Sequence, residues 1–341
     1  MVFMKFYNVK LFTFLSCILL IFLITSCAIQ KSTFKFNTKN MKVALVLPGP
    51  VNNSSRNLAA YNGLKRFLED YQAEIAVVEK VSLSESRKIF SSLAERKFDL
   101  IIGQGFEYGF VVKKIAKMFP DTFFCIIGGD VSQEPNLCSF NFKDEQYGYL
   151  VGIVAGLNTT TNKIGIVIGK KSPAEEKVVI GIRKGLKAVN PKADLIVSFI
   201  NTIEDISKGR EAAIDQINEG VDVVTYLADT AGIGVIKAAE DSDISAIGSV
   251  IDQHDMAPTT VITSGIQDTS QLIYLACEYY SEEILESRIY RFGLKNQVVE
   301  LAPSYGNIDP TTETRINRIK TKLTEQEAPE VQQNTKQKDK K

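Results

Sequence analysis

The sequence contains no tryptophan and only one histidine, His254, in 341 residues. A triad hydrolase needs a histidine base, so such chemistry would have to use this one residue. A metal site built from several histidines is excluded for the same reason. No serine or cysteine nucleophile stands in a recognisable elbow motif, and we expect His254 at the surface or at the rim of a cleft. The sequence therefore indicates no catalytic residues and no enzyme.

Cysteine is also scarce, and the five cysteines form no CxxC pair. The absence of this spacing argues against a metal site or a redox motif. Cys125 and Cys138 lie in apolar, strand-like runs, and Cys277 lies in a helical pattern. Neighbouring strands could join the first two in a disulfide if the protein is exported, but we favour buried free thiols. We expect no metal and no cofactor.

Neither sign of charge is in excess, because 40 Lys and Arg balance 40 Asp and Glu. A net charge of zero indicates no nucleic-acid partner. The 45% of hydrophobic and 23% of charged residues are ordinary for a folded soluble protein. A chain of 341 residues is long enough for two domains.

The longest hydrophobic run lies close to the N-terminus. Leu11–Ile24 is almost without polar residues, follows the basic residues Lys5 and Lys10, and is too short to span a bilayer comfortably. It leads through Thr25 and Ser26 into Cys27, a pattern that resembles the lipobox of bacterial lipoproteins.

We therefore expect residues 1–26 to be a lipoprotein signal peptide and residues 27–40 to be a polar tether. Cys27 would carry the lipid, including palmitate, and hold the protein on a lipid bilayer. The protein would face the periplasm or the cell exterior. An uncleaved anchor helix or an ordinary secretory signal is the alternative.

From Met41 onward, strand patterns alternate with helix patterns. Such alternation predicts right-handed βαβ units on parallel sheets, and two successive series predict two similar lobes. We predict an α/β fold of two Rossmann-like lobes with parallel sheets joined by a hinge. The expected strands are 42–47, 74–79, 99–103, 123–128, 137–141, 163–168, 194–199, 222–226, 244–249, 260–263 and 297–301. The expected helices are 55–70, 84–96, 107–118, 145–158, 174–189, 205–219, 231–241 and 268–286.

Polar or glycine-rich stretches follow most of these strands. Ligands of parallel α/β sheets bind at the carboxyl ends of the strands, and two sheets facing each other across a hinge would bring these stretches to one cleft. An ordinary solvated loop is the alternative for any one of them. The candidate ligand-binding residues are Asn52, Asn53, Asn57, Phe106, Glu107, Asp130, Thr202, Asp229, Asp252 and Gln267. Phe106 would supply an apolar face, and the amides and carboxylates would supply hydrogen bonds.

Two of these stretches have a chemical alternative. Gly103-Gln104-Gly105 follows a strand and opens a helix, but Tyr108 stands where a dinucleotide-binding motif needs a third glycine. We interpret these glycines as a tight turn that exposes helix N–H groups to a ligand. Asp229 and Asp252 could be an acid–base pair, but no other catalytic group accompanies them, so we interpret both as hydrogen-bond acceptors.

A set of short motifs occurs in a recognisable order. It comprises Asn57…Asn62-Gly63, Tyr147–Gly152, Gly181…Gly185, Gly209, Gly220–Val223, Ala231–Gly234, Ala246–Gly248, Asp252-Gln253 and Val261–Ser264. With these motifs, about residues 24–305 resemble the basic membrane protein (BMP) family of bacterial substrate-binding lipoproteins. That family includes purine nucleoside receptors of ABC importers and Med-type regulators.

The chain departs from the nucleoside receptors of this family. Those receptors open with D-G-x-F-x-D-x-x-F-N, whereas the matching stretch 48–57 keeps only Gly49 and Asn57. A second aromatic, an acid and a lysine of the family are replaced by Ile203, Val250 and Gln267. In the receptors, the aromatics sandwich the base, and the acid and the lysine hold the sugar. The departures argue against nucleoside recognition, and the Med-type members resemble this chain more closely here.

The resemblance implies a type I periplasmic-binding-protein fold whose chain crosses between lobes near residues 142, 251 and 287. The first lobe would comprise 41–142 plus 252–287, and the second 143–251 plus 288–323. Residues 324–341 are polar and without apolar periodicity, so we expect a disordered tail.

The implied function is capture of a small polar solute, nucleoside-like or other, in the cleft between the lobes. The protein would act as a monomer and deliver the solute to an ABC permease in the membrane. The alternative is a surface signalling or adhesive lipoprotein with a vestigial cleft.

Overall fold

The computed structural model describes residues 34–53 and 55–327. Both sheets of the fold lie between Lys42 and Leu301. The predicted signal peptide, Cys27 and most of the predicted tether lie outside the described residues, as do residues 328–341.

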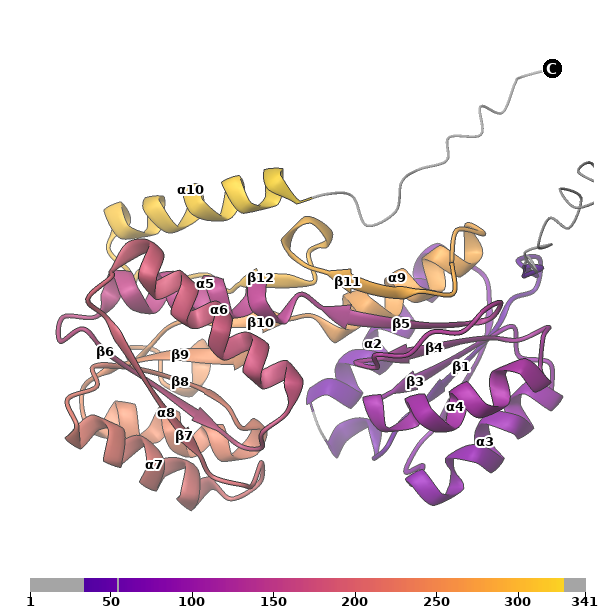
Figure 1. Cartoon of the computed structure of the whole chain (residues 1–341), viewed down its shortest axis with the longest axis horizontal. Coiled ribbons are helices and arrows are strands. Elements are labelled where there is room, and N and C mark those ends of the chain that lie inside the picture. Colours follow the sequence, from indigo (N-terminus) through magenta and orange to yellow (C-terminus); the bar gives the residue numbers. More distant parts are fainter. Residues whose placement is uncertain (1–33, 54, 328–341) are drawn as a thin grey trace, which may run out of the picture. The chain divides into compact units, whose positions relative to one another are not determined.

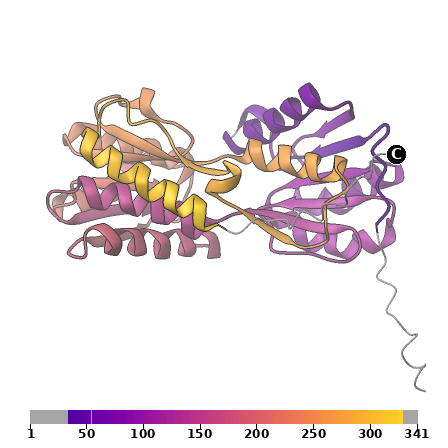
Figure 2. The same cartoon turned by 90° about the horizontal axis from the view of Figure 1, so that it is seen from above.

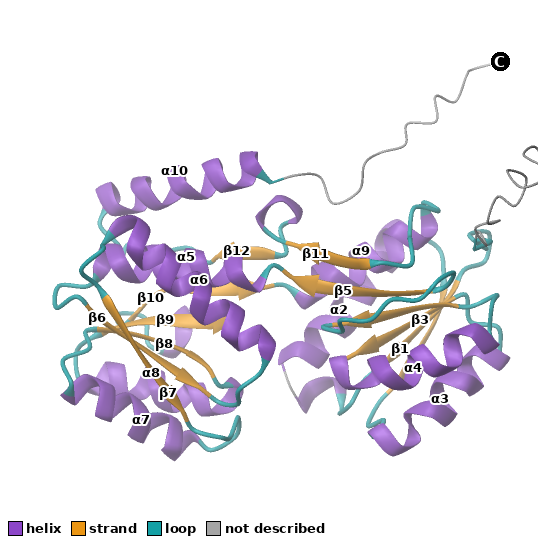
Figure 3. Cartoon of the chain, in the orientation of Figure 1, coloured by secondary structure: helices purple, strands orange, loops and turns teal. Residues whose placement is uncertain are grey.

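The first lobe is built on a six-stranded sheet with the order β11-β5-β4-β3-β1-β2 (Figures 1 and 3). All of its pairings are parallel. Almost every residue of β1, β3 and β4 is buried, which explains why these strands are continuous apolar runs in the sequence. The strands are β1 (Lys42–Val46), β2 (Glu74–Val78), β3 (Leu100–Gln104), β4 (Phe123–Ile127), β5 (Leu137–Phe142) and β11 (Ile289–Phe292).

Helices cover both faces of this sheet (Figure 1). On one face, Phe90 of α3 and Val112 of α4 pack with the strand residues Val46 and Ile101. On the other face, α2 and α9 pack against each other, and α9 contacts β3, β4 and β5. These helices are α2 (Ser55–Asp70), α3 (Leu83–Glu95), α4 (Gly109–Ile115) and α9 (Thr269–Ser281), with 3-10 turns η1 (Val51–Asn53), η2 (Phe106–Tyr108) and η3 (Ala116–Met118).

The second lobe repeats this plan with the strand order β12-β10-β9-β8-β6-β7, in which only the β10–β12 pairing is antiparallel. The side chains of β6 alternate between two cores: Ile164 and Ile166 pack with α5 and α6, and Val167 packs with α7 and α8. The strands are β6 (Lys163–Ile168), β7 (Asp194–Phe199), β8 (Val223–Leu227), β9 (Ser245–Val250), β10 (Val261–Gln267) and β12 (Val299–Leu301). The helices are α5 (Asp144–Asn158), α6 (Pro173–Val189), α7 (Ile206–Asn218) and α8 (Gly232–Asp241), with 3-10 turns η4 (Asp229–Ala231), η5 (His254–Met256) and η6 (Leu294–Asn296).

The assignment of segments to lobes differs from the expectation at two strands. β10 lies within 252–287, which we expected in the first lobe, but it pairs with β9 in the second sheet. β11, which the sequence pattern missed, pairs with β5 in the first sheet, although 288–323 was expected in the second lobe. The chain therefore passes between the sheets near 143, which agrees with the crossing expected near 142. The other two passages lie near 268 and 293 rather than near 251 and 287. An apolar strand is compatible with either sheet, and only the available neighbour decides which one it joins.

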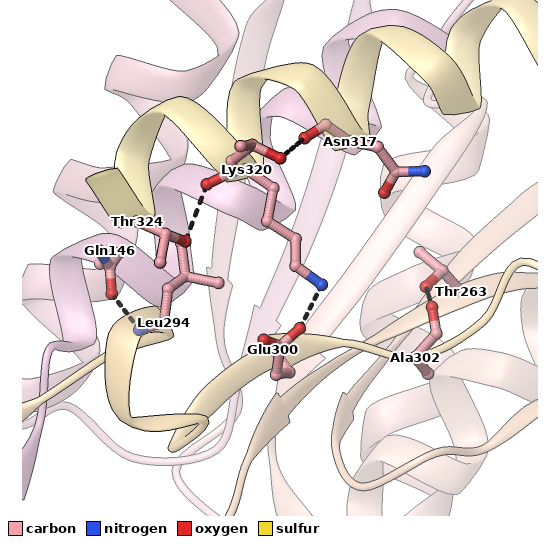
Figure 4. A network of polar contacts seen from close by, with 9 residues as sticks. Gln146, Thr263, Leu294, Glu300, Ala302, Asn317, Lys320 and Thr324 are labelled. Atoms are coloured by element: carbon pink, nitrogen blue, oxygen red, sulfur yellow. Dashed lines mark hydrogen bonds and ion pairs between the residues drawn. The ribbon is translucent and has the colours of Figure 1, made fainter. Parts of the chain in front are cut away.

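A further helix, α10 (Pro310–Gln326), was also missed because only one of its residues, Ile316, is fully buried. Asp309 caps the helix by accepting hydrogen bonds from the backbone N–H groups of Thr311 and Thr312. Ile316 packs into the core of the second lobe, along which α10 lies (Figure 2). Lys320 forms an ion pair with Glu300 of β12 (Figure 4). The expected disordered tail from 324 was therefore wrong for residues 324–326, which are helical.

Glycines bring the backbones of α5 and α6 unusually close. A Cβ atom on Gly148 would lie 2.1 Å from the carbonyl oxygen of Val178, and one on Gly152 would lie 2.3 Å from that of Ile182. From the other helix, a Cβ atom on Gly181 would lie 2.1 Å from the carbonyl oxygen of Glu145. Gly148 lies against Val178, and four residues further along both helices Gly152 lies against Ile182. The helices α5 and α6 are therefore parallel and begin at the same end of the pair.

We predict that Gly152→Ala destabilises the protein. The new methyl group would meet backbone atoms, which cannot rotate away, so the helices must separate at a cost of about 1–3 kcal/mol or more. The measurement is the midpoint of thermal unfolding. The matched control is Gly109→Ala at the start of α4, where the nearest atom is a valine methyl group at 3.1 Å. Equal midpoints for the two variants would contradict the close packing of α5 on α6.

Candidate functional site

Two cavities lie along the segments that connect the lobes. The larger has a volume of about 450 Å³ and is lined by Phe142, Lys143, Asp144, Glu145, Gln146, Tyr149, Lys177, Arg291 and Leu323. The smaller has a volume of about 200 Å³ and is lined by Arg56, Ala59, Val250, Ile251, Asp252, Ile266, Gln267, Asp268 and Thr269. Both combine residues of the two lobes, as expected for a ligand site at a domain junction.

Asp144, the first residue of α5, lines the larger cavity. Its Oδ1 accepts a hydrogen bond of 3.3 Å from Nε2 of Gln267, which lines the smaller cavity. Burial raises the pKa of the Asp144 carboxyl to about 6, against the lowering effects of the Lys177 charge and of the Gln267 hydrogen bond. Asp144 is therefore a carboxylate that the protein stabilises incompletely.

Lys177 is positioned by the start of α6. Ser172 caps this helix by accepting a hydrogen bond from the N–H of Ala174, Pro173 occupies the first turn, and the Glu175 side chain returns to the Ser172 hydroxyl. The Ser172 cap and Pro173 fix the first turn of α6. Lys177 follows directly after that turn, is exposed and lines the cavity.

The smaller cavity contains Asp252, whose two carboxylate oxygens are both used. Oδ1 accepts a hydrogen bond from the backbone N–H of His254 at 3.1 Å, and Oδ2 accepts one from the Tyr305 hydroxyl at 2.6 Å. The His254 ring stacks on Tyr305 with 3.9 Å between ring centroids. Asp252 thus orders a local cluster at the edge of the cavity, and His254 is partly buried within that cluster.

Of the ten candidate residues, Asp252 and Gln267 line a cavity, and both line the smaller one. Asp130 lines neither, but it forms an ion pair of 2.8 Å with Arg291, which lines the larger cavity. Asn57 is buried at the start of α2, where its Nδ2 donates to the carbonyl oxygen of Pro50 at 3.1 Å. That bond shapes the loop after β1.

The remaining candidates lie outside both cavities. Thr202 accepts hydrogen bonds from the N–H groups of Glu204 and Asp205 and so shapes the loop before α7. The exposed residues are Asn52, Asp229 and Phe106, whose side chain is 72% exposed. Glu107 is partly buried in η2, and the side chain of Asn53 is outside the described part of the structure.

The turn after β3 agrees with the expected tight turn at Gly105, whereas Gly103 lies within β3 itself. Gly105 has a φ of 126°, a conformation that side-chain-bearing residues rarely adopt, and the chain there enters the 3-10 turn η2. Cys125, Cys138 and Cys277 are buried free thiols, as we favoured, although Cys125 and Cys138 are direct partners across β4 and β5.

Sequence reasoning missed Asp144, Lys177 and Arg291 at the larger cavity. The sequence prediction rested on polar residues that follow strands, whereas Asp144 and Lys177 lie within helices, at the first residue of α5 and the fifth residue of α6. The available signal was an acidic residue opening the most apolar helix pattern of the chain. The sequence alone does not relate Asp144 to Lys177, because only the packing of α5 on α6 brings both residues to the same cavity.

Comparison with known proteins gives a consistent result. Residues 40–335 match the family model described as Bmp, ABC transporter substrate-binding protein PnrA-like. A CD4+ T-cell-stimulating antigen of Listeria innocua is 27% identical, over 86% of this chain and 89% of that protein. A transcriptional activator of the comK gene from Bacillus halodurans has a structure similar to this one, with 25% identity, a TM-score of 0.75 and coverage of 84% and 98% of the two chains. An ABC transporter solute-binding protein from Conexibacter woesei gives 25% identity and a TM-score of 0.69, with 85% and 99% covered.

The chain belongs to the Bmp, or PnrA-like, family of ABC transporter substrate-binding proteins. The predicted family and the predicted type I periplasmic-binding-protein fold are both confirmed. Among residues 34–53 and 55–327, no helix combines the length and the apolar character that a membrane span requires.

We predict that Asp144→Asn stabilises this family member at neutral pH. The folded-state pKa of about 6 lies above the ordinary 3.8, so the contribution of Asp144 to wild-type stability is largest at low pH and falls as pH rises from about 4 past 6. Asparagine is neutral, so it removes the free-energy cost of burying the ionised carboxylate, and it can still accept the hydrogen bond from Gln267. The thermal midpoint should rise by a few degrees at pH 7.5, at about 2–4 °C per kcal/mol, and the gain should vanish near pH 4.

The control is Asp215→Asn, an exposed carboxylate on α7. It should leave the midpoint unchanged at both pH values. A lower midpoint for Asp144→Asn at pH 7.5 would contradict the prediction, because it would mean that interactions within the fold fully offset the cost of burying the ionised carboxylate.

Proposed function

We propose that this protein captures a small polar solute at the junction of its lobes and presents it to an ABC permease. The observation that carries the proposal is the placement of two cavities, each lined by charged and apolar side chains, beside the three segments that join the lobes. A solute held there contacts both lobes, so binding favours closure about those segments, a change that a membrane partner can recognise. Membership of a family of ABC transporter substrate-binding proteins supports the same function.

The site residues in this proposal are those that line the cavities, together with the loops after the strands. Gln267 and Asp252 retain their predicted role, and Asp144, Lys177 and Arg291 are added. Phe106 and Asn52 are exposed on the first lobe and would reach a solute only in a closed form. The protein acts without catalysis and as a monomer in this scheme.

The first test is a thermal-shift screen of the purified protein with nucleosides, sugars and amino acids, together with mass spectrometry of any co-purified solute. A receptor should gain about 2.7 kcal/mol at a solute concentration one hundred times its Kd. Asp252→Ala should abolish the shift of a solute that occupies the smaller cavity, and Asp215→Asn should not change it. No shift with any compound and no co-purified solute would favour a signalling or adhesive lipoprotein with a vestigial cleft.

We further propose that lipid on Cys27 anchors the protein to the membrane, a proposal that rests on the sequence alone. Cys27→Ala should abolish labelling with radioactive palmitate and shift the protein from the membrane to the soluble fraction. Cys277→Ala, which removes a buried thiol of α9, is the control and should remain labelled. Unchanged labelling of Cys27→Ala would exclude this anchor.

A further inference from the structure

The larger cavity is lined by five charged side chains, those of Lys143, Asp144, Glu145, Lys177 and Arg291. Glu175 of α6 does not line the cavity, but its charge acts on the Asp144 carboxyl. Three of the lining charges already have partners. Lys143 pairs with Glu327, Glu145 pairs with Lys184, and Arg291 pairs with Asp130. These pairs leave little charge for a solute to satisfy.

Asp144 and Lys177 differ from these three. Within the described part of the chain, neither forms an ion pair, although each feels the charge of the other. From the described residues, the Asp144 carboxylate accepts one side-chain hydrogen bond, which the neutral amide of Gln267 donates. A carboxylate taken out of water without a cation is costly, and a suitable partner would recover that cost. The cavity therefore offers one unpaired acid and one unpaired base.

The backbone reinforces this arrangement. Since α5 and α6 are parallel, both helix N-termini lie at the same end of the pair, close to Asp144 and Lys177. The positive ends of two helix dipoles favour a negative group nearby. The apolar side chains of Phe142, Tyr149 and Leu323 complete the wall. A solute that fits would carry a cation, an anion and an apolar portion.

We propose that the larger cavity binds a zwitterionic solute, an α-amino acid or short peptide with an apolar side chain, whose ammonium group pairs with Asp144 and whose carboxylate pairs with Lys177. This inference rests on the proposed solute-binding function and names the class of solute. A volume of about 450 Å³ lies within the usual range for small-molecule sites.

The pH dependence of binding follows from the groups that face Asp144: Lys177 and Glu175 on α6, Arg56 on α2 and Gln267 at the end of β10. An ammonium group needs the ionised carboxylate. Because burial raises the pKa of Asp144 to about 6, affinity should be full near pH 8 and should fall as pH drops below about 6.

The experiment is isothermal titration of the purified protein with L-leucine at pH 7.5. 4-Methylpentanoate, which lacks the ammonium group, and isoamylamine, which lacks the carboxylate, are the matched probes. L-Leucine should bind, and both single-ended analogues should bind at least about tenfold more weakly. Asp144→Asn and Lys177→Gln should each weaken L-leucine binding by a similar factor. Asp215→Asn on α7 and Lys192→Gln in the loop after α6 are exposed controls and should not.

The outcomes separate this inference from the proposed function. If adenosine or guanosine binds but no amino acid or dipeptide does, the proposed solute-binding function stands and the proposed zwitterionic class of solute is wrong. L-Leucine binding that is unchanged in both variants would overturn the assignment to Asp144 and Lys177. If no compound in the screen binds and no solute co-purifies with the protein, the proposed solute-binding function itself is wrong.

Discussion

The close approach of α5 and α6 is the contact on which the site depends. Glycines at 148, 152, 181 and 185 let each backbone lie against carbonyl oxygens of the other helix, with no side chain between them. The same contact fixes where the two helices begin. Asp144 is the first residue of α5 and Lys177 the fifth of α6, so the packing of the second lobe sets the distance between an acid and a base at the cavity.

The charges around the larger cavity illustrate a conflict between stability and binding. Paired charges such as Lys143 with Glu327 support the fold and leave nothing for a solute to satisfy. Among the described residues, the hydrogen-bond partner of the Asp144 side chain is the amide of Gln267, and burial raises the pKa of Asp144 to about 6, so ionisation of this carboxyl lowers the stability of the fold. A binding protein can tolerate such a cost, because the solute that supplies the missing cation recovers it.

The segments that join the lobes are also tied to the C-terminal part of the chain. The Glu327 carboxylate contacts Lys143, at the first passage between the sheets, and accepts a hydrogen bond from the backbone N–H of Lys295, just after the third. Gln146 accepts one from the N–H of Leu294 (Figure 4). Residues 310–327 therefore contact the same connecting segments that border the larger cavity. A lobe movement has to accommodate these contacts.

The amino-acid sequence by itself determined the two lobes, the parallel sheets and the family. Those features follow from local apolar periodicity and from motifs such as Tyr147–Gly152, which each segment carries independently of its neighbours. The tertiary structure decided which sheet β10 and β11 join, because a short strand is compatible with any free edge. It also decided the site: Gln267 was found from the end of its strand, whereas Asp144 and Lys177, thirty-three positions apart, meet only because α5 packs on α6. Local sequence encodes how a segment folds, but a shared cavity depends on distances between segments, and these are set only when the cores close.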